Sequence, residues 1–404
     1  MDPKRIGKRI ESLRKKCGMT QQALSQKLDV TDKAISKWEN GIGYPDITFL
    51  PKLSSIFGVT VDYLLFGPKQ GIAIAGNIIT DIVKNIDTYP KMGMLTYVTD
   101  TTYAVGGCVP NTAIDLAKID QTIPIHALGK VGSDENGRFI LAQLIKHGIS
   151  VNGISFSSDN VTSFCDVVSV PAGERTFFHN KGANAEFSPA DIDIGSLDCS
   201  MLHIGYLLLL DAFDKPHKEY GTVMASFLKD VQEAGIKTSI DVVSDSTVNY
   251  AEKIIPVLKY CNYAIMNEIE CCVIWQCDAY DEQGNLNKET IKQCMKKMRD
   301  CGVKDKIIIH SKTYSFVLDV QSGEFTESPS LKIPQDCIKG SVGAGDAFCA
   351  GCLYALYNQF SDKELLDFAS AAAACSLFAT NSTDGMKSKM EIMQMLVKYG
   401  RMPS

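Results

Sequence analysis

Residues 4–66 carry apolar side chains at the spacing of α-helices, in short runs separated by breaks. Ile6, Ile10 and Leu13 recur at intervals of three and four positions and therefore share one helical face. Thr20 precedes a second run and is a good N-cap, because its hydroxyl can accept a hydrogen bond from a free backbone N–H. The pattern predicts a small unit built of short helices.

The later helices of this unit are bounded by residues that cap or break helices. A third helix is predicted over residues 32–40, with inward-facing positions at Ala34, Ile35 and Trp38. Gly41 ends it, because glycine readily adopts the left-handed backbone found at helix ends. Pro45 and Asp46 are predicted to open a fourth helix. Residues 67–71 contain two Gly and one Pro and are predicted to form a linker.

From residue 71 onward, short apolar runs alternate with segments of helical length. The predicted strands are residues 72–75, 123–128, 201–204, 238–242, 263–266 and 307–309. The predicted helices between them include residues 137–147, 220–234 and 288–301. This alternation favours a mainly parallel sheet with helices on both faces. Because ligands bind beyond the carboxyl ends of such strands, functional residues are expected just after them.

Composition excludes several other classes of protein. The chain has 404 residues, of which 45% are hydrophobic and 22% charged, and these are ordinary values for globular domains. No apolar stretch reaches the length of a membrane-spanning helix, and no apolar segment follows the basic N-terminus as in a secretory signal. We therefore expect a cytoplasmic protein without membrane contact, whose 14 cysteines stay reduced.

The charge is distributed unevenly along the chain. The formal net charge is −6, yet residues 1–68 hold eleven Lys and Arg against seven Asp and Glu. A basic segment in front of an acidic body hints at an appended nucleic-acid module.

The second and third predicted helices are joined by a short turn, which is the helix-turn-helix arrangement whose second helix can enter the major groove of DNA. Residues 20–41 resemble the Cro-like (XRE-type) phage-repressor family. The resemblance implies that residues 1–67 bind double-stranded DNA, with the chain acting as a homodimer. The DNA-contacting residues that it implies are Gln21, Gln22, Asp32, Lys33, Ser36 and Lys37. The alternative is a small helical bundle for protein contacts, with Lys33 and Lys37 simply solvated.

A glycine-rich turn at residues 340–346 carries the strongest local signal for chemistry. Gly343 and Gly345 let backbone approach a ligand, and a helix is predicted to start there, so its free N–H groups form an anion site. Asp346 in the first helical turn can take a proton from a hydroxyl beside that anion, which suits phosphoryl transfer to an alcohol. The alternative is an ordinary helix start in which Asp346 only stabilises the helix dipole, and this stretch alone leaves both open.

Five further motifs precede this turn, and the P-loop motif of other kinases is missing. They are found at residues 76–81, 106–113, 129–137, 174–185 and 267–270. In this order, the motifs of residues 71–397 resemble the ribokinase-like (PfkB) carbohydrate kinase family. The resemblance implies an α/β fold with a mainly parallel sheet, helices on both faces, and a small β lid built from residues near 80–110 and 160–185. An all-α helix-turn-helix domain precedes it.

The resemblance also implies a role for each motif in ATP-dependent phosphorylation of a sugar hydroxyl. Asp346 would be the general base, and the backbone of Gly343, Ala344 and Gly345 would form the anion hole. Hydroxyls of the acceptor would be held by Asp81, Gly106, Gly107 and Asn111. Asn267 and Glu270 would place Mg²⁺, Glu270 largely through water, and with it the phosphates of ATP. An alternative for this last pair is a cap between a strand and a helix.

The chain departs from the family pattern in two places. Gly340 and Ser341 stand where the family usually has Asp and Thr, which puts K⁺ activation in question. Residues 310–312, beginning with His310, replace the Thr and Gly that border the nucleotide, and His310 is expected to be a loop residue. These departures keep two other functions open. One is a transcriptional regulator that senses a sugar or nucleotide with weak or no kinase activity, and the other is a nucleoside kinase.

Two cysteines follow the glycine-rich turn. Cys349 and Cys352 share one face of the predicted helix, but no residues nearby in the sequence supply partners for a metal or redox role. We therefore expect both to be buried packing residues.

Overall fold

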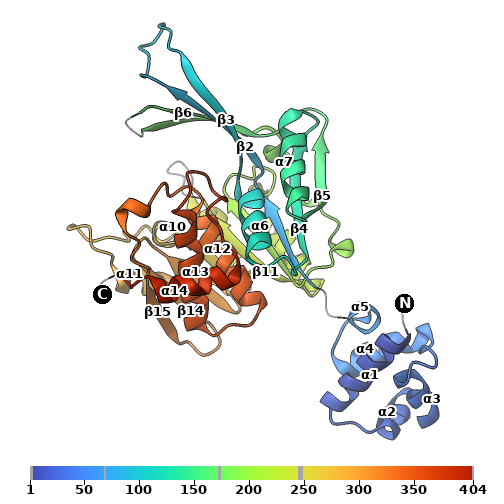
Figure 1. Cartoon of the computed structure of the whole chain (residues 1–404). Coiled ribbons are helices and arrows are strands. Elements are labelled where there is room, and N and C mark those ends of the chain that lie inside the picture. The colour runs from blue at the N-terminus through green and yellow to red at the C-terminus, as the bar shows by residue number, and fades with distance from the viewer. Residues whose placement is uncertain (1–2, 68–69, 172–173, 244–248, 403–404) are drawn as a thin grey trace. The chain divides into compact units, whose positions relative to one another are not determined.

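The structure is a computed structural model of the whole chain, and it describes residues 3–67, 70–171, 174–243 and 249–402. The chain divides into two compact units, Met1–Gln70 and Gly71–Ser404 (Figure 1). Pro68 and Lys69 of the expected linker lie outside the described residues. In the part that is described, no helix is both long enough and apolar enough to cross a bilayer.

The described part of the first unit is helical throughout. Its elements are α1 Pro3–Lys16, α2 Gln21–Leu28, α3 Asp32–Glu39, the 3₁₀ turn η1 Ile47–Phe49, α4 Leu50–Phe57 and α5 Val61–Phe66. The predicted inner face is confirmed, because Ile6, Ile10 and Ile35 are buried in one cluster. Thr20 caps α2 as predicted, and its hydroxyl accepts a hydrogen bond from the N–H of Ala23. The predicted fourth helix starts differently, since Asp46 caps η1 and α4 follows only after that turn.

An ion pair inside the first unit joins α1 to the end of α3. The Arg14 guanidinium donates to both carboxylate oxygens of Glu39, at 2.6 and 2.9 Å, and both side chains are buried. The Gln21 amide also donates to Glu39, at 2.7 Å. A buried carboxylate needs such partners, so this pair fixes how α2 and α3 pack against α1.

The second unit is built on a nine-stranded sheet. Its strands are β1 Ile72–Gly76, β4 Ile125–Gly132, β5 Ser150–Ser157, β8 Met201–Leu207, β11 Lys237–Val242, β12 Tyr263–Asn267, β13 Lys306–His310, β14 Tyr314–Asp319 and β15 Phe325–Pro329. They lie in the order β15-β14-β13-β12-β11-β8-β1-β4-β5. Neighbouring strands from β13 to β5 pair in parallel, and only β14 is reversed, pairing antiparallel with β13 and with the edge strand β15. The predicted mainly parallel sheet is confirmed.

Each face of this sheet is covered by its own set of helices and has its own core (Figure 1). Successive strand residues point to opposite faces, so Ile72 and Ile74 enter one core and Ala73 and Ala75 enter the other. The first core packs α6 Cys108–Ile119, α7 Glu135–Lys146, α12 Ala344–Tyr357, α13 Asp362–Ser376 and α14 Lys389–Lys398. The second packs α8 Val223–Glu233, α9 Tyr250–Leu258, α10 Glu268–Val273 and α11 Lys288–Asp300. Strands buried on both faces explain the continuous apolar runs in the sequence.

A separate four-stranded sheet projects from the large unit (Figure 1). Its order is β3-β2-β6-β7, from β2 Ile79–Ile86, β3 Val98–Gly106, β6 Phe164–Ser169 and β7 Arg175–Asn180. These are the two segments expected to form a lid, and this prediction is confirmed. Asn184, just after β7, is fully buried. Its side-chain oxygen accepts a hydrogen bond from the N–H of Ile78, and its side-chain nitrogen donates one to the C=O of Ile78, each at 3.0 Å. The base of the lid is therefore anchored to the chain that leaves β1.

Smaller elements complete the second unit. They are the hairpin β9 Pro216–His217 with β10 Gly221–Thr222 and the 3₁₀ turns η2 Gly182–Ala185, η3 Pro189–Asp191, η4 Ile194–Ser196 and η5 Gln335–Cys337. The predicted helix over residues 220–234 begins later, at Val223, because Gly221 and Thr222 pair with β9 and Thr222 then caps the helix.

Candidate active site

A cavity of about 280 Å³ opens at the carboxyl ends of the parallel strands. Its walls include Tyr206 near the end of β8, Asp241 on β11, Asn267 at the end of β12 and His310 at the end of β13. The turn that begins α12 forms another wall, with Ser341, Gly343, Ala344, Gly345 and Asp346. The general rule for parallel sheets placed functional residues just after strands, and the cavity agrees with it.

The glycine-rich turn has the backbone geometry of an anion site. Gly343 is the N-cap of α12 and has φ 77°, a left-handed value that favours glycine. A Cβ at this position would lie 2.6 Å from the Cβ of Ser382, so the turn also has no room for a side chain. Ala344, Gly345 and Asp346 form the first turn of the helix, where backbone N–H groups have no partner within the helix. The N–H of Ala344 donates to the backbone oxygen of Ser341 at 3.3 Å, which a bound anion would replace.

Asp346 contributes a buried carboxyl group to the wall of the cavity. It is 4% exposed, and its Oδ2 accepts hydrogen bonds from Asn111 Nδ2 at 2.9 Å and from the Tyr206 hydroxyl at 3.0 Å. Burial raises its pKa to about 7, and the nearby negative charge of Asp241 adds to this effect, while the two hydrogen bonds oppose it. A carboxyl group with this pKa can accept a proton and release it again near neutral pH.

Tyr206 links two carboxylates of the site, and the sequence analysis did not identify it. Its backbone has φ 57°, which is unusual for a residue with a side chain. In this conformation its N–H donates to Asp241 while its hydroxyl reaches Asp346. Strained backbone of this kind concentrates at functional sites. The one available sequence signal was its position at the end of a predicted strand.

Three of the four expected acceptor-binding residues lie around the start of α6. Gly107 is the N-cap of α6 with φ 85°, and a Cβ there would lie 2.5 Å from the backbone oxygen of Asn77. Gly106 contacts Asp81 so closely that a Cβ would lie 2.5 Å from its Oδ2. Asn111, one turn into α6, connects this region to Asp346. Burial raises the pKa of Asp81 to about 6.

Asn267 and Glu270 form the helix cap that was one of the two expectations for them. The N–H of Glu270 donates to Asn267 Oδ1 at 2.8 Å, and the N–H of Asn267 donates to Glu270 Oε2 at 3.0 Å. Both residues also line the cavity, so capping holds their oxygen atoms beside the glycine-rich turn. Oxygen ligands of this type suit Mg²⁺.

A second cavity of about 550 Å³ shares His310, Ser341, Ala344 and Gly345 with the first. The expectation that His310 lies in a loop is wrong, because it is the last residue of β13 and pairs in register with Asn267. Its ring packs against Phe348 with 4.5 Å between centroids. Burial lowers its pKa to about 4, so the ring is neutral at physiological pH.

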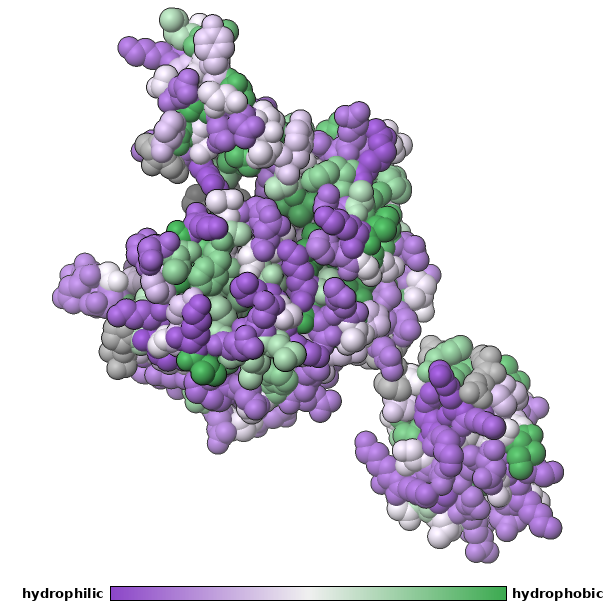
Figure 2. Space-filling view, in the orientation of Figure 1, coloured by the Kyte–Doolittle hydropathy of each residue, from purple (hydrophilic) through white to green (hydrophobic). Residues whose placement is uncertain are grey.

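The first unit presents the residues expected to contact DNA in different ways. Gln22, Asp32, Lys33 and Lys37 are exposed, whereas Ser36 is partly buried. Gln21 is partly buried as well, and its amide is engaged with Glu39. The face of this unit visible in Figure 2 is mostly hydrophilic.

The fold and the cavity define the chain as an α/β protein of the ribokinase-like fold. The ribokinase of Arabidopsis thaliana, solved with ribose and ATP, superimposes with a TM-score of 0.67 at 20% identity, covering 81% of this chain and 98% of that one. Residues 69–389 match the family model for pfkB family carbohydrate kinases. The chain therefore belongs to the pfkB family of carbohydrate kinases.

Curated relatives cover the two units separately. The 5-dehydro-2-deoxygluconokinase of Geobacillus kaustophilus is 22% identical over 352 residues, which is 82% of this chain and 95% of that protein. Residues 10–64 match the helix-turn-helix family model. The HTH-type transcriptional activator BcrR of Enterococcus faecalis is 43% identical over 64 residues, 16% of this chain and 31% of that protein.

Proposed function

We propose that this protein transfers the terminal phosphoryl group of ATP to a hydroxyl of a sugar or sugar derivative, and that residues 1–67 bind double-stranded DNA. The observation that carries the kinase proposal is Asp346 beside the glycine-rich turn, with its carboxylate oriented by Asn111 and Tyr206. Two hydrogen bonds on one oxygen fix the carboxylate, so the general base needs little reorganisation before it meets the acceptor.

In this mechanism the acceptor hydroxyl lies against Asp346, which takes its proton as the oxygen attacks phosphorus. The backbone N–H groups of Gly343, Ala344 and Gly345 stabilise the charge on the transferred group. Mg²⁺, when bound, neutralises phosphate charge, and Asn267 and Glu270 are the residues that would hold it, Glu270 mainly through water. The second cavity, which Phe348 lines, would hold the adenine ring of ATP.

Unpaired polar atoms support an acceptor rich in hydroxyls. Among the described residues, the side-chain amide of Asn77, the hydroxyl of Thr80 and Oδ1 of Asn111 are buried without a hydrogen-bond partner. Buried polar groups normally have hydrogen-bond partners, so the hydroxyls of a bound acceptor would supply the partners that these atoms lack. Asp81 extends this set with a carboxylate at the base of the lid.

The experiment is a transfer assay with Mg-ATP and a panel of sugars, sugar derivatives and nucleosides. Phosphorylated product is identified by mass, and Asp346→Asn is the matched control. We expect turnover of at least one acceptor, reduced by about 10²- to 10⁴-fold in the variant, as is typical for loss of a general base. The absence of any transfer above the variant's level would refute the kinase proposal.

The same panel tests the second candidate, a regulator that senses a sugar or nucleotide. This candidate is favoured by the fused helix-turn-helix unit and by the residues that replace the family pattern at Gly340 and His310. Acceptors that raise the melting temperature without being phosphorylated would support sensing. A matching change in affinity for an operator duplex would establish it.

A further inference from the structure

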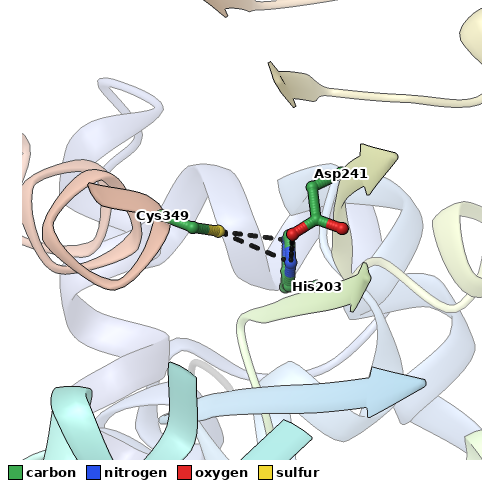
Figure 3. A group of neighbouring side chains, drawn as sticks. All are labelled: His203, Asp241 and Cys349. Carbon is green, nitrogen blue, oxygen red and sulfur yellow. Dashed lines mark hydrogen bonds and ion pairs between the residues drawn. The ribbon is translucent and has the colours of Figure 1, made fainter. Parts of the chain in front are cut away.

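Three side chains that can ligate metals converge in the second unit (Figure 3), and two of them, Asp241 and Cys349, line the first cavity. His203 comes from β8, Asp241 from β11 and Cys349 from α12, and all three are buried. One nitrogen, one oxygen and one sulfur atom from this group all lie within 4.8 Å of one another. None of the three contacts the acceptor or the phosphoryl group in the mechanism proposed above, although the charge of Asp241 helps to raise the pKa of Asp346.

Two of the ligand separations have the length of an edge in a tetrahedral zinc site. Cys349 Sγ lies 3.5 Å from His203 Nε2, and Asp241 Oδ2 lies 3.5 Å from the same nitrogen. Zinc bonds of about 2.0–2.3 Å at tetrahedral angles give ligand separations of roughly 3.3–3.5 Å. The nitrogen–oxygen distance is also longer than a normal hydrogen bond, so His203 and Asp241 do not form a close pair with each other.

Two of these ligands, His203 and Asp241, are held in place by contacts with neighbouring groups that are not ligands. Ser239 Oγ lies 3.0 Å from His203 Nδ1, which leaves Nε2 as the nitrogen for a metal. Cys349 Sγ lies 3.5 Å from Nε2 and 3.9 Å from Nδ1, so it stands beside the ring and turns towards the Nε2 lone pair when a metal binds. The other oxygen of Asp241, Oδ1, accepts the backbone N–H of Tyr206. Metal-binding histidines and carboxylates typically have such outer partners, because these fix the ring and the carboxylate in place.

We propose that His203, Asp241 and Cys349 bind one Zn²⁺ ion. A thiolate and an imidazole are soft ligands that select zinc over Mg²⁺, so this site is distinct from the magnesium position at Asn267 and Glu270. Asp241 and Cys349 also line the cavity, so the fourth coordination position is open to it. Three protein ligands and one open position are the pattern of an accessible zinc site. The proposal does not depend on the kinase activity.

The test uses the full-length protein, stripped of metal and kept reduced with a phosphine. Zn²⁺ affinity is measured by competition with a chromophoric chelator, and Co²⁺ serves as a spectroscopic probe for a cysteine ligand. We expect one equivalent bound with a thiolate-to-cobalt charge-transfer band. Because loss of even an outer partner costs about 10- to 100-fold in affinity, Cys349→Ser is expected to weaken Zn²⁺ binding by at least about 100-fold and to remove the band.

Cys352→Ser is the matched control, since Cys352 is buried on the same helix one turn further along and is not one of the three ligands. This variant is expected to keep both the affinity and the band. Asp241→Asn keeps the size of the side chain and replaces the carboxylate ligand by an amide. It provides a second measurement of Zn²⁺ affinity if Cys349→Ser does not fold. Failure of the wild type to bind Zn²⁺, or binding that survives both Cys349→Ser and Asp241→Asn, would overturn the proposal.

Discussion

The raised pKa of Asp346 predicts that the wild-type residue destabilises the fold at neutral pH. An aspartate whose pKa rises from its ordinary 3.8 to about 7 on folding is protonated in the folded state while the unfolded state ionises. Its contribution to stability is therefore fully present below pH 3.8 and is lost as the pH rises towards 7. Asp346→Asn removes this loss, because an amide does not ionise.

The magnitude follows from the two pKa values. A shift of about three pH units corresponds to about 4 kcal/mol once the pH exceeds both values. Between pH 5 and pH 7 the wild type is expected to lose about 2 kcal/mol relative to Asp346→Asn, with almost no further change up to pH 9. The comparison isolates Asp346, because every other titrating group is common to the two proteins.

The two tryptophans allow a clean assay. Trp38 lies in the first unit and Trp275 in the second, so a Trp38→Phe background leaves fluorescence that reports only the unit containing Asp346. Urea unfolding of both proteins is compared at each pH from 5 to 9. Asp198→Asn, at an exposed aspartate, is the control and should give no pH-dependent difference. A constant stability difference between Asp346→Asn and wild type across this range would refute the reasoning.

Three other predictions concern separate parts of the molecule. Gly106→Ala is expected to raise the acceptor KM by about 10- to 100-fold, because the added Cβ displaces the Asp81 carboxylate that is proposed to bind acceptor hydroxyls, and steady-state kinetics will detect this. Arg14→Ala is expected to destabilise the first unit by about 3–5 kcal/mol, because it leaves a buried carboxylate unpaired, and unfolding followed by the tryptophan on α3 measures this. Lys33→Ala with Lys37→Ala is expected to reduce the slope of log affinity against log salt by about 2 on an operator duplex, and an unchanged slope would exclude phosphate contacts at these residues.

Local rules predicted much of the fold. The alternation of apolar runs and helical segments identified six of the nine strands and the placing of helices on both faces, because strands buried on both faces are apolar throughout. It missed β5, β14 and β15, which lie at or next to the edges of the sheet. The cap at Thr20 also followed from residue type, and the cap at Asn267 was one of two alternatives for that residue. The turn at residues 340–346 was recognisable from its glycines, since the φ of 77° at Gly343 favours glycine.

The sequence by itself determined the class of fold, the family and the residues of each motif, because these depend on neighbours along the chain. Only the tertiary structure decided the electrostatics of the site. The pKa of Asp346 depends on burial and on Asp241, and the latter lies over one hundred residues away. His203, Asp241 and Cys349 likewise meet only because two strands and a helix from distant segments pack around one cavity. Burial and long-range contact arise from packing, which no local pattern encodes.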